Sequence, residues 1–270
     1  MSKLEYTFKT DTLFKMIFVK YPDLLRRLVA ELLAIPFESI GEFVIKNPEI
    51  PPEILGGKFC RLDILMDVDG RQVDLEIQVE DEDNYVDRSL YYWAREHSTA
   101  LSEGKDYSML PRTIIVSILA FNLFDCKEFH SEFRLLEVTR HTQLTDKICL
   151  HYFELKKLPK VENAADKLKL WLALFNATTQ EELERLVSIG GEVMAQAVKA
   201  YHNVSSTQEF RMLERMREDM RNNEITALNR ARRQEKKAIA RAMLAEGMDV
   251  DTVARLSGLF IDDILRLQSE

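Results

Sequence analysis

The sequence is poor in several features that would assign it to a class of protein at once. Its three cysteines, Cys60, Cys126 and Cys149, are few, odd in number and far apart. This usage fits a reducing compartment and argues against both a disulfide framework and a cysteine-ligated zinc. The net charge is −8, so the chain lacks the global basic signature common in nucleic-acid binders. Any affinity for phosphate groups therefore has to be local.

Long apolar segments are also missing. The longest apolar run, Thr113 to Phe124, is too short to cross a bilayer. The first eighteen residues carry acids and lack a clean apolar centre, so we expect no signal peptide and no membrane partner. The chain has 270 residues, of which 46% are hydrophobic and 30% charged. We expect a cytoplasmic globular protein of one or two domains.

Familiar catalytic motifs are absent as well. There is no phosphate-binding P-loop, no GxGxxG and no GxSxG elbow. The histidines show no HExxH or other ligand spacing, so each is expected to be structural or on the surface. The five are His97, His130, His141, His151 and His202. Pairing of a cysteine with a histidine in space stays open.

What is present is a stretch, Lys58 to Glu80, with the pattern of a β-hairpin. Two runs with period-two alternation flank Asp69-Gly70, which suits a two-residue type I′ turn because both central positions need positive φ. This turn sets a register in which Asp63 lies opposite Glu76. One face of the hairpin is then wholly apolar, and the other is largely polar and charged.

The opposed carboxylates of Asp63 and Glu76 are the anomaly of the polar face. At a cross-strand Cβ separation of roughly 4.5–5.5 Å, like charges destabilise the pair unless a cation relieves them. A hard divalent cation is one solution, since Mg²⁺ is held by one or two carboxylates together with water and substrate phosphate. The alternative is a solvated polar face with Arg61 as the counter-charge. The spacing alone does not decide between them.

The rest of the first 155 residues alternates helical and strand patterns. A helical stripe runs from Asp11 to Leu33 with a break at Pro22, and Lys15 lies one turn after Asp11 on the same face. A short strand at Ile40 to Lys46 precedes the hairpin. A strand, a helix and a strand in one sheet imply a right-handed crossover with parallel pairing. The later elements expected are a helix at Tyr85–Glu103 with Val86, Leu90, Trp93, Ala94, His97 and Leu101 on its apolar face, a buried strand at Thr113–Phe121, and strands toward the sheet edge at Glu132–Thr139 and Lys147–Leu155.

From Ala164 onward the pattern is helical. Thr179 is expected to cap one helix, Gly190-Gly191 to interrupt it, and a long polar helix to follow from Thr207 to Glu246. Between Arg230 and Arg241 this long helix carries six basic residues against Glu235 alone: Arg230, Arg232, Arg233, Lys236, Lys237 and Arg241. This basic stretch is either a phosphate-binding patch or a solvated helix face.

The tail has two short helical patterns around Gly258 and resembles a helix-turn-helix. Its second helix opens with Asp262 and Asp263, which would repel phosphates. We therefore interpret the tail first as a helical docking or oligomerisation element that would make a homo-oligomer, and second as a DNA reader. The expected domains are a core at 1–160, a helical extension packed on it at 161–205 and a helical arm at 206–270.

Several stretches together resemble a known family. An Asp on one hairpin strand, Glu-x-Gln on the next and a following helix with basic and aromatic residues are similar to the PD-(D/E)XK nuclease fold. In more detail, the chain resembles the Rpn family of recombination-promoting nucleases, PD-(D/E)XK transposase relatives. The matching stretches are DTLFKMIF, RLDILMDVDGRQVDLEIQVE, DRSLYYWAREHSTALSEGKDYSMLPRTIIVSIL and GLFIDDILRL. The resemblance implies an α/β (α+β) restriction-endonuclease-like core, with a mixed central sheet flanked by helices and a helical C-terminal region.

The resemblance also implies a metal-dependent DNA endonuclease linked to recombination or mobile elements. Asp63 and Glu76 would hold Mg²⁺ (or Mn²⁺) together with the carbonyl of Ile77, and Gln78 would hold the attacking water. Gln78 stands where the wider superfamily usually has a lysine, which would stabilise charge developing on the phosphate. A chain with such a weakened site could instead be a nucleic-acid-binding or interaction module.

Other residues are implied as supports of this site. Lys15, Arg61 and Arg88 are candidates for the missing positive charge, and Asp11 for an additional acid near the metal. The basic stretch Arg230 to Arg241, and Arg88 with Arg95, would contact the DNA backbone without reading sequence.

Overall fold

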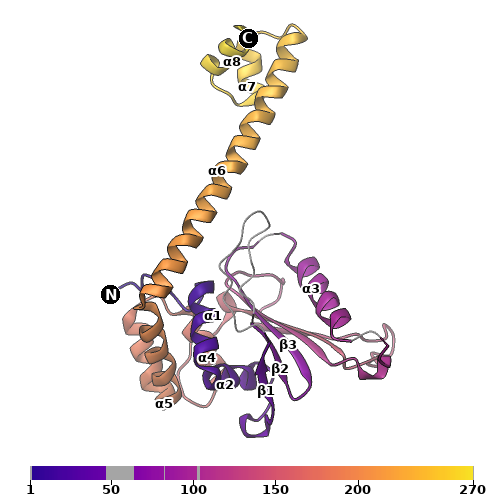
Figure 1. The fold of residues 1–270 in the computed structure, drawn as a ribbon, viewed down its shortest axis with the longest axis vertical. Coiled ribbons are helices and arrows are strands. Elements are labelled where there is room, and N and C mark those ends of the chain that lie inside the picture. Colours follow the sequence, from indigo (N-terminus) through magenta and orange to yellow (C-terminus); the bar gives the residue numbers. More distant parts are fainter. Residues whose placement is uncertain (1, 47–63, 82, 102–103, 270) are drawn as a thin grey trace. The chain divides into compact units, whose positions relative to one another are not determined.

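The computed structural model describes residues 2–46, 64–81, 83–101 and 104–269 (Figure 1). The chain forms two compact units, Met1–Arg211 and Met212–Glu270, and each is described by itself. The three-part division expected from the sequence stays a prediction. Among the helices that the structure describes, none combines the length and the apolar character needed to cross a membrane.

The first unit contains a mixed sheet, as the sequence predicts. In the described ranges six strands pair in the order β1-β2-β3-β4-β6-β5. The pairs β3–β4 and β4–β6 are parallel and the others are antiparallel. The strands are β1 (Phe43–Ile45), β2 (Ile64–Val68), β3 (Arg71–Gln78), β4 (Thr113–Leu119), β5 (His130–Phe133) and β6 (Ile148–Glu154).

The register expected for the hairpin is confirmed wherever the structure describes it. Ile64 lies opposite Leu75, and the pairing continues in step to the turn. Asp69 and Gly70 adopt φ values of 51° and 73°, as a type I′ turn requires. Asp63, and with it the expected pairing to Glu76, lies outside the described residues.

Helices cover both faces of the sheet. The α-helices of this unit are α1 (Asp11–Lys20), α2 (Pro22–Leu32), α3 (Tyr85–Thr99), α4 (Lys167–Asn176) and α5 (Gln180–Ser205), and the short 3₁₀ turns are Phe37–Ser39, Tyr107–Met109 and Leu155–Lys157. Figure 1 shows α3 on one side of the sheet and α1, α2, α4 and α5 grouped on the other. The helices of that group contact one another, and α3 contacts β4. Aromatic rings of Phe14, Phe18, Trp171 and Phe175 fill the space between α1 and α4.

Local signals in the helices act as expected. Pro22 begins α2 directly after α1 ends. Thr179 and Glu182 form a capping box at the start of α5, which satisfies two backbone N–H groups of the first turn. Gly191 interrupts the same helix with φ 63° and ψ −143°, a backbone conformation that glycine tolerates because it has no Cβ.

The two later strands differ from the expectation. β6 is not at an edge: it lies between β4 and β5, and all of its residues except Ile148 are buried. β5 begins at His130 and stops at Phe133, well short of Thr139. The chain turns instead at Glu137, whose carboxylate accepts backbone N–H bonds from Thr139 at 3.2 Å and Arg140 at 2.6 Å. A side chain that satisfies backbone donors in this way competes with strand pairing.

The face that α3 presents to the sheet also differs. Val86 and Leu90, expected on the apolar face, are exposed, and the buried positions are Tyr85 and Ser89. The helix ends at Thr99, earlier than expected. The buried positions at the start of the helix therefore lie one residue earlier than expected, because the hydroxyl groups of Tyr85 and Ser89 bind polar groups of the sheet.

The second unit consists of helices. Its elements are most of α6 (Gln208–Ala245), α7 (Val250–Ser257) and α8 (Ile261–Ser269). Ala240, Val253, Ile264 and Leu267 form its buried core. Asp249 caps α7, and Gly258 ends it in the left-handed conformation with φ 63°. The two short helices around Gly258 are therefore confirmed.

Candidate active site

The polar side of the hairpin is buried rather than solvated. Side chains two residues apart on a strand share a face, so Gln72, Asp74 and Glu76 all lie on the face that α3 covers. Their exposed fractions are only 3%, 4% and 2%. The alternative of a solvated polar face is therefore wrong for these positions. Buried carboxylates are costly unless partners or cations compensate them, so this face has to supply such groups.

Glu76 is held by a tyrosine. The hydroxyl of Tyr85, at the start of α3, lies 2.8 Å from Oε2 of Glu76 and 2.9 Å from Oγ of Ser117. A phenol has one proton, so Tyr85 donates it to the carboxylate and accepts the proton of the serine hydroxyl. Ser117 lies directly beside Glu76 in the parallel pairing of β3 and β4. The arrangement fixes one oxygen of Glu76.

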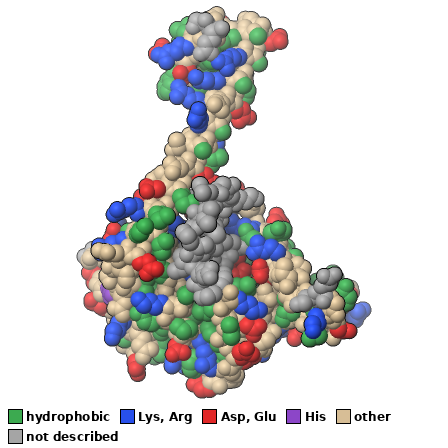
Figure 2. All heavy atoms as spheres, in the orientation of Figure 1, with side chains coloured by type: hydrophobic (Ala, Val, Ile, Leu, Met, Phe, Trp, Pro, Cys, Tyr) green, Lys and Arg blue, Asp and Glu red, His purple; other side chains and the backbone are tan. Residues whose placement is uncertain are grey.

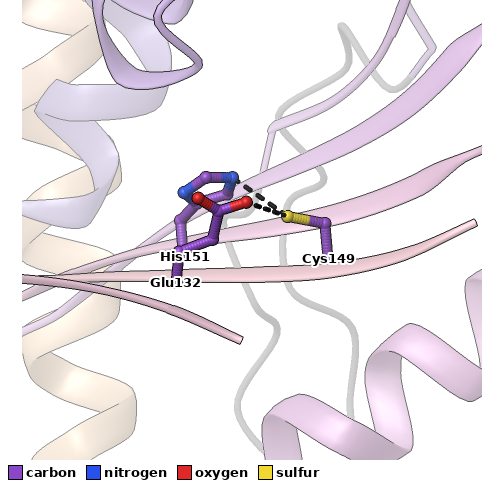
Figure 3. A group of neighbouring side chains, drawn as sticks. All are labelled: Glu132, Cys149 and His151. Atoms are coloured by element: carbon purple, nitrogen blue, oxygen red, sulfur yellow. Dashed lines mark hydrogen bonds between the residues drawn. The ribbon is translucent and has the colours of Figure 1, made fainter. Parts of the chain in front are cut away.

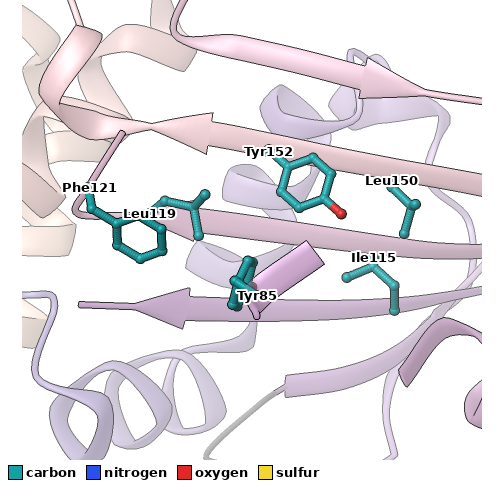
Figure 4. Close-up of a cluster of buried hydrophobic side chains, with 6 residues drawn as sticks. All are labelled: Tyr85, Ile115, Leu119, Phe121, Leu150 and Tyr152. Carbon is teal, nitrogen blue, oxygen red and sulfur yellow. The ribbon is translucent and has the colours of Figure 1, made fainter. Parts of the chain in front are cut away.

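Tyr85 itself is anchored in an apolar cluster. Figure 4 shows it against Ile115, Leu119, Phe121, Leu150 and Tyr152, which come from β4, β6 and the residues after β4. A second hydroxyl pair, Ser89 Oγ and Tyr152 Oη at 2.6 Å, joins α3 to β6 within the same layer. The position of Glu76 is therefore determined by packing as well as by hydrogen bonding.

Asp74 is a member of this face that the sequence analysis did not single out. It precedes Glu76 by two residues on β3 and lies beside Ile115 of β4. The alternation of the strand was a usable signal, because it places Asp74 and Glu76 on one face. Asp74 and Glu76 are therefore two buried carboxylates, two residues apart on one face of β3. They make the region rich in oxygen atoms that can bind a metal and in negative charge.

Two further expected residues lie near this site. Gln78 continues the row at the end of β3, where its amide donates to the carbonyl of Glu80 at 2.9 Å. The guanidinium of Arg88 lies 4.9 Å from the centre of the Tyr85 ring, so the ring connects a cation to the carboxylate of Glu76. The structure thus places Glu76 and Arg88 at Tyr85, and Gln78 follows Glu76 on the same face of β3.

The other expected residues are placed differently. Asp63 and Arg61 lie outside the described ranges. Asp11 and Lys15 belong to α1, in the helical group on the opposite side of the sheet from α3. Lys15 is only 2% exposed, and an ammonium group so buried needs hydrogen-bonding or anionic partners.

Arg95 and Ile77 have limited roles in this geometry. Arg95 pairs with Glu96 at 2.9 Å and lies 5.3 Å from the ring of Tyr92. Ile77 alternates with Glu76 and Gln78, so its side chain points to the opposite face and only its carbonyl can serve as a ligand.

The donor set of the α3 face fits a hard divalent cation. Carboxylates, a carbonyl and hydroxyls are oxygen ligands, and Mg²⁺ or Mn²⁺ prefers such ligands. Glu76 is the described residue best placed to hold the cation, with Asp74 nearby and the carbonyl of Ile77 next in the chain. A cation here would also compensate the charge of the two buried carboxylates.

The C-terminal unit gathers basic side chains, as Figure 2 shows in blue on that unit at the top of the view. Arg233 binds both carboxylate oxygens of Asp263 at 3.0 Å. Lys236 lies against the turn between α7 and α8. Its Nζ is 3.3 Å from the position that a Cβ atom at Gly258 would occupy. One of the two acids that argued against DNA binding is therefore paired within the unit.

Comparison with known proteins matches nearly the whole chain. Residues 8–231 match the model of the PD-(D/E)XK nuclease family transposase, and residues 233–269 match the C-terminal HTH domain of the Rpn/YhgA-like nuclease family. The resemblance of the tail to a helix-turn-helix is thus confirmed, and its interpretation as a docking or oligomerisation element stays a prediction. Neither the curated proteins nor the solved structures gave a match. The chain belongs to the PD-(D/E)XK nuclease family transposases, and it carries the C-terminal helix-turn-helix domain of the Rpn/YhgA-like nucleases.

Proposed function

We propose that the protein is a Mg²⁺-dependent DNA endonuclease that hydrolyses phosphodiester bonds. The observation that carries the proposal is the buried carboxylate of Glu76, oriented by Tyr85 and accompanied by Asp74 on one face of β3. Asp63 is the expected second ligand. A role in recombination or in mobile elements follows from the family rather than from the geometry.

The residues of the site have separable tasks. A bound Mg²⁺ supplies Lewis acidity to the phosphoryl oxygen and lowers the pKa of a coordinated water. Tyr85 keeps Oε2 of Glu76 fixed, so the carboxylate presents its ligand oxygen in one orientation. Gln78 orients the attacking water through its side-chain amide. Arg88, held over Tyr85, offers positive charge to the scissile phosphate.

The net charge of −8 disfavours binding of DNA to the chain as a whole. The C-terminal unit would supply the affinity for DNA. Six basic residues lie between Arg230 and Arg241, and five of them are exposed. Backbone contacts of this kind position a protein on DNA and weaken as salt concentration rises. Helix α8, the second helix of the helix-turn-helix, would then face the major groove.

One observation favours a second candidate function, a nucleic-acid-binding module with a weakened site. Gln78 replaces the usual lysine, and its amide contacts the carbonyl of Glu80 within the chain. Such a protein would bind DNA through its C-terminal unit without cutting it.

Nicking of supercoiled plasmid distinguishes the two. We expect cleavage by the wild type with Mg²⁺, none with EDTA, and at least a hundredfold loss in Glu76→Gln. Glu128→Gln, an exposed carboxylate outside the site, is the matched control and should cut like the wild type. Gel-shift assays in EDTA confirm that each variant still binds DNA. Equal cleavage by the wild type and Glu76→Gln would overturn the proposal, and binding without cleavage by any form would establish the module.

A further inference from the structure

A second group of ligand-type side chains lies on the other face of the sheet, near its β5 edge. Glu132 of β5 and His151 of β6 are directly paired residues. Cys149 precedes His151 by two residues and therefore shares its face. Figure 3 shows the three side chains converging from the two strands. One ligand atom from each lies within 4.8 Å of the others.

The separations suit a tetrahedral metal site. Sγ of Cys149 lies 3.2 Å from Nε2 of His151 and 3.3 Å from Oε1 of Glu132. Typical zinc–sulfur, zinc–nitrogen and zinc–oxygen bond lengths with tetrahedral angles place such ligand atoms about 3.4–3.6 Å apart. Small side-chain movements would therefore suffice to admit the ion.

The surroundings of His151 favour a ligand role. Its Nδ1 lies 3.0 Å from Nε2 of His130, so a proton on Nδ1 can be donated there while the lone pair of Nε2 points to Cys149. A fixed tautomer of this kind is the usual arrangement behind a metal-bound histidine.

Cys149 is poorly suited to an alternative role as a nucleophile. It is 0% exposed, which leaves no access for a substrate. Burial and the neighbouring Glu132 raise the pKa of its thiol, whereas a nucleophile needs a thiolate at neutral pH. A metal ion removes this objection, because binding replaces the thiol proton, which is released to solvent.

We infer that Glu132, Cys149 and His151 form a zinc site with three protein ligands, separate from the oxygen-rich site on the α3 face. Sulfur and imidazole ligands select Zn²⁺ over Mg²⁺. Thiolate and carboxylate together balance the charge of the ion. Arg134, which donates to Oε1 of Glu132, has to shift, and Arg112, a further cation near Cys149 and His151, opposes the ion. The side chain of Glu132 is 32% exposed, which gives the ion an entry at the sheet edge and a position for a water as fourth ligand.

Metal binding at this site would stabilise the pairing of the edge strand β5 with β6. β5 has four residues and pairs on one side only, with β6. An ion bound to Glu132 of β5 and to Cys149 and His151 of β6 joins the two strands. The zinc-bound protein is therefore expected to melt at a higher temperature than the zinc-free protein.

Cobalt titration tests the inference on the full chain. Co²⁺ added to protein stripped with chelator should give a sulfur-to-cobalt charge-transfer band and the strong visible bands of a tetrahedral site, at one equivalent. Zn²⁺ should displace it and Mg²⁺ should not. Cys149→Ser should lose the charge-transfer band, whereas the matched Cys126→Ser and Cys60→Ser variants should keep it. Cys126 is an exposed free cysteine elsewhere in the chain.

Two variants keep the test decisive if Cys149→Ser does not fold. Glu132→Gln removes an edge-strand ligand and should weaken zinc binding at least tenfold. His130→Ala removes the partner of His151 and should weaken it about 10–100-fold. The inference fails if wild type gives no tetrahedral cobalt spectrum, if the sulfur band survives in Cys149→Ser, or if zinc affinity is unchanged in Glu132→Gln.

Discussion

The two faces of one sheet carry opposite chemistries. Toward α3, β3 presents the carboxylate oxygens of Asp74 and Glu76, and Tyr85 holds Glu76 by a hydrogen bond. Toward the other face, β5 and β6 present the carboxylate of Glu132, the thiol of Cys149 and the imidazole of His151. Both sets hold a carboxylate near other polar groups, and Glu132 is the exposed member, at the sheet edge. The two sets differ in their atoms: the α3 face has hard carboxylate oxygens, whereas the other face adds the softer sulfur and nitrogen atoms of Cys149 and His151.

A single residue step along a strand is enough to separate the two groups of side chains. Successive strand residues point to opposite faces, so each strand can serve two environments. β6 illustrates this, because Tyr152 packs beside Tyr85 while Cys149 and His151 point away from it. A hard-ion site and a soft-ion site can therefore share a sheet without sharing a ligand.

The largest expected effect comes from removing the charge of Glu76. Glu76→Gln should reduce Mg²⁺-dependent cleavage at least a hundredfold while leaving the cobalt–sulfur band of the opposite face intact. Plasmid nicking and absorption spectroscopy on one preparation measure both. Loss of the cobalt band in this variant would show that the two faces are one coupled site.

Removing the support of Glu76 should have a smaller effect. Tyr85→Phe keeps the ring in its apolar cluster and deletes the hydroxyl that holds Oε2. We expect cleavage to fall about 10–100-fold and the Mg²⁺ concentration for half-maximal rate to rise. A Mg²⁺ titration of the nicking rate gives both values. An unchanged Mg²⁺ requirement would mean that Tyr85 only packs.

Gln78→Lys tests whether a positive charge at the usual lysine position of the α3 face increases the cleavage rate. Gln78→Lys should raise the cleavage rate about tenfold, because a cation beside the phosphate stabilises developing charge. Single-turnover rates at saturating Mg²⁺ measure this directly. A slower variant would indicate that the amide of Gln78 has a task that lysine cannot perform.

The smallest expected effect concerns pH and a histidine on the α3 side. Burial, together with the charge of Lys147, lowers the pKa of His97, whose Nδ1 lies 2.9 Å from Oγ1 of Thr113. The unfolded chain takes up this proton near pH 6.5 and the folded chain only at lower pH. Stability is thus lost as pH falls below about 6.5.

His97→Gln should lose less stability than the wild type between pH 8 and pH 5.5. The free energy of unfolding in urea at both values provides the measurement. Burial also lowers the pKa of His130 and His151 on the other face, so part of the dependence should remain. An identical pH dependence in both proteins would contradict the assignment to His97.

Much of the active-site face could be predicted from the sequence because its determinants are local. Asp69-Gly70 fixes the turn, and the turn with the alternation fixes which side chains share a face with Glu76. The start of the inward face of α3 was predicted wrongly, because Tyr85 and Ser89 are buried with their hydroxyl groups hydrogen-bonded to polar groups of the sheet. Hydrophobic periodicity does not detect such positions.

The group on the other face was missed for a different reason. Glu132 meets His151 only through the pairing of β5 with β6, and nothing in the sequence sets that register. The expectation of no cysteine-ligated zinc rested on the small and odd number of cysteines and on their wide spacing. Cys149-Leu150-His151 was the available signal, since a Cys-x-His run on a strand places both ligands on one face.

The proposed nuclease activity depends on a metal ion held by the carboxylates of the α3 face. Its most direct test is nicking of supercoiled plasmid with Mg²⁺, with EDTA, and by Glu76→Gln and Asp63→Ala. The account predicts metal-dependent nicking by the wild type that both substitutions abolish while DNA binding persists. Nicking by either variant at the wild-type rate would contradict it.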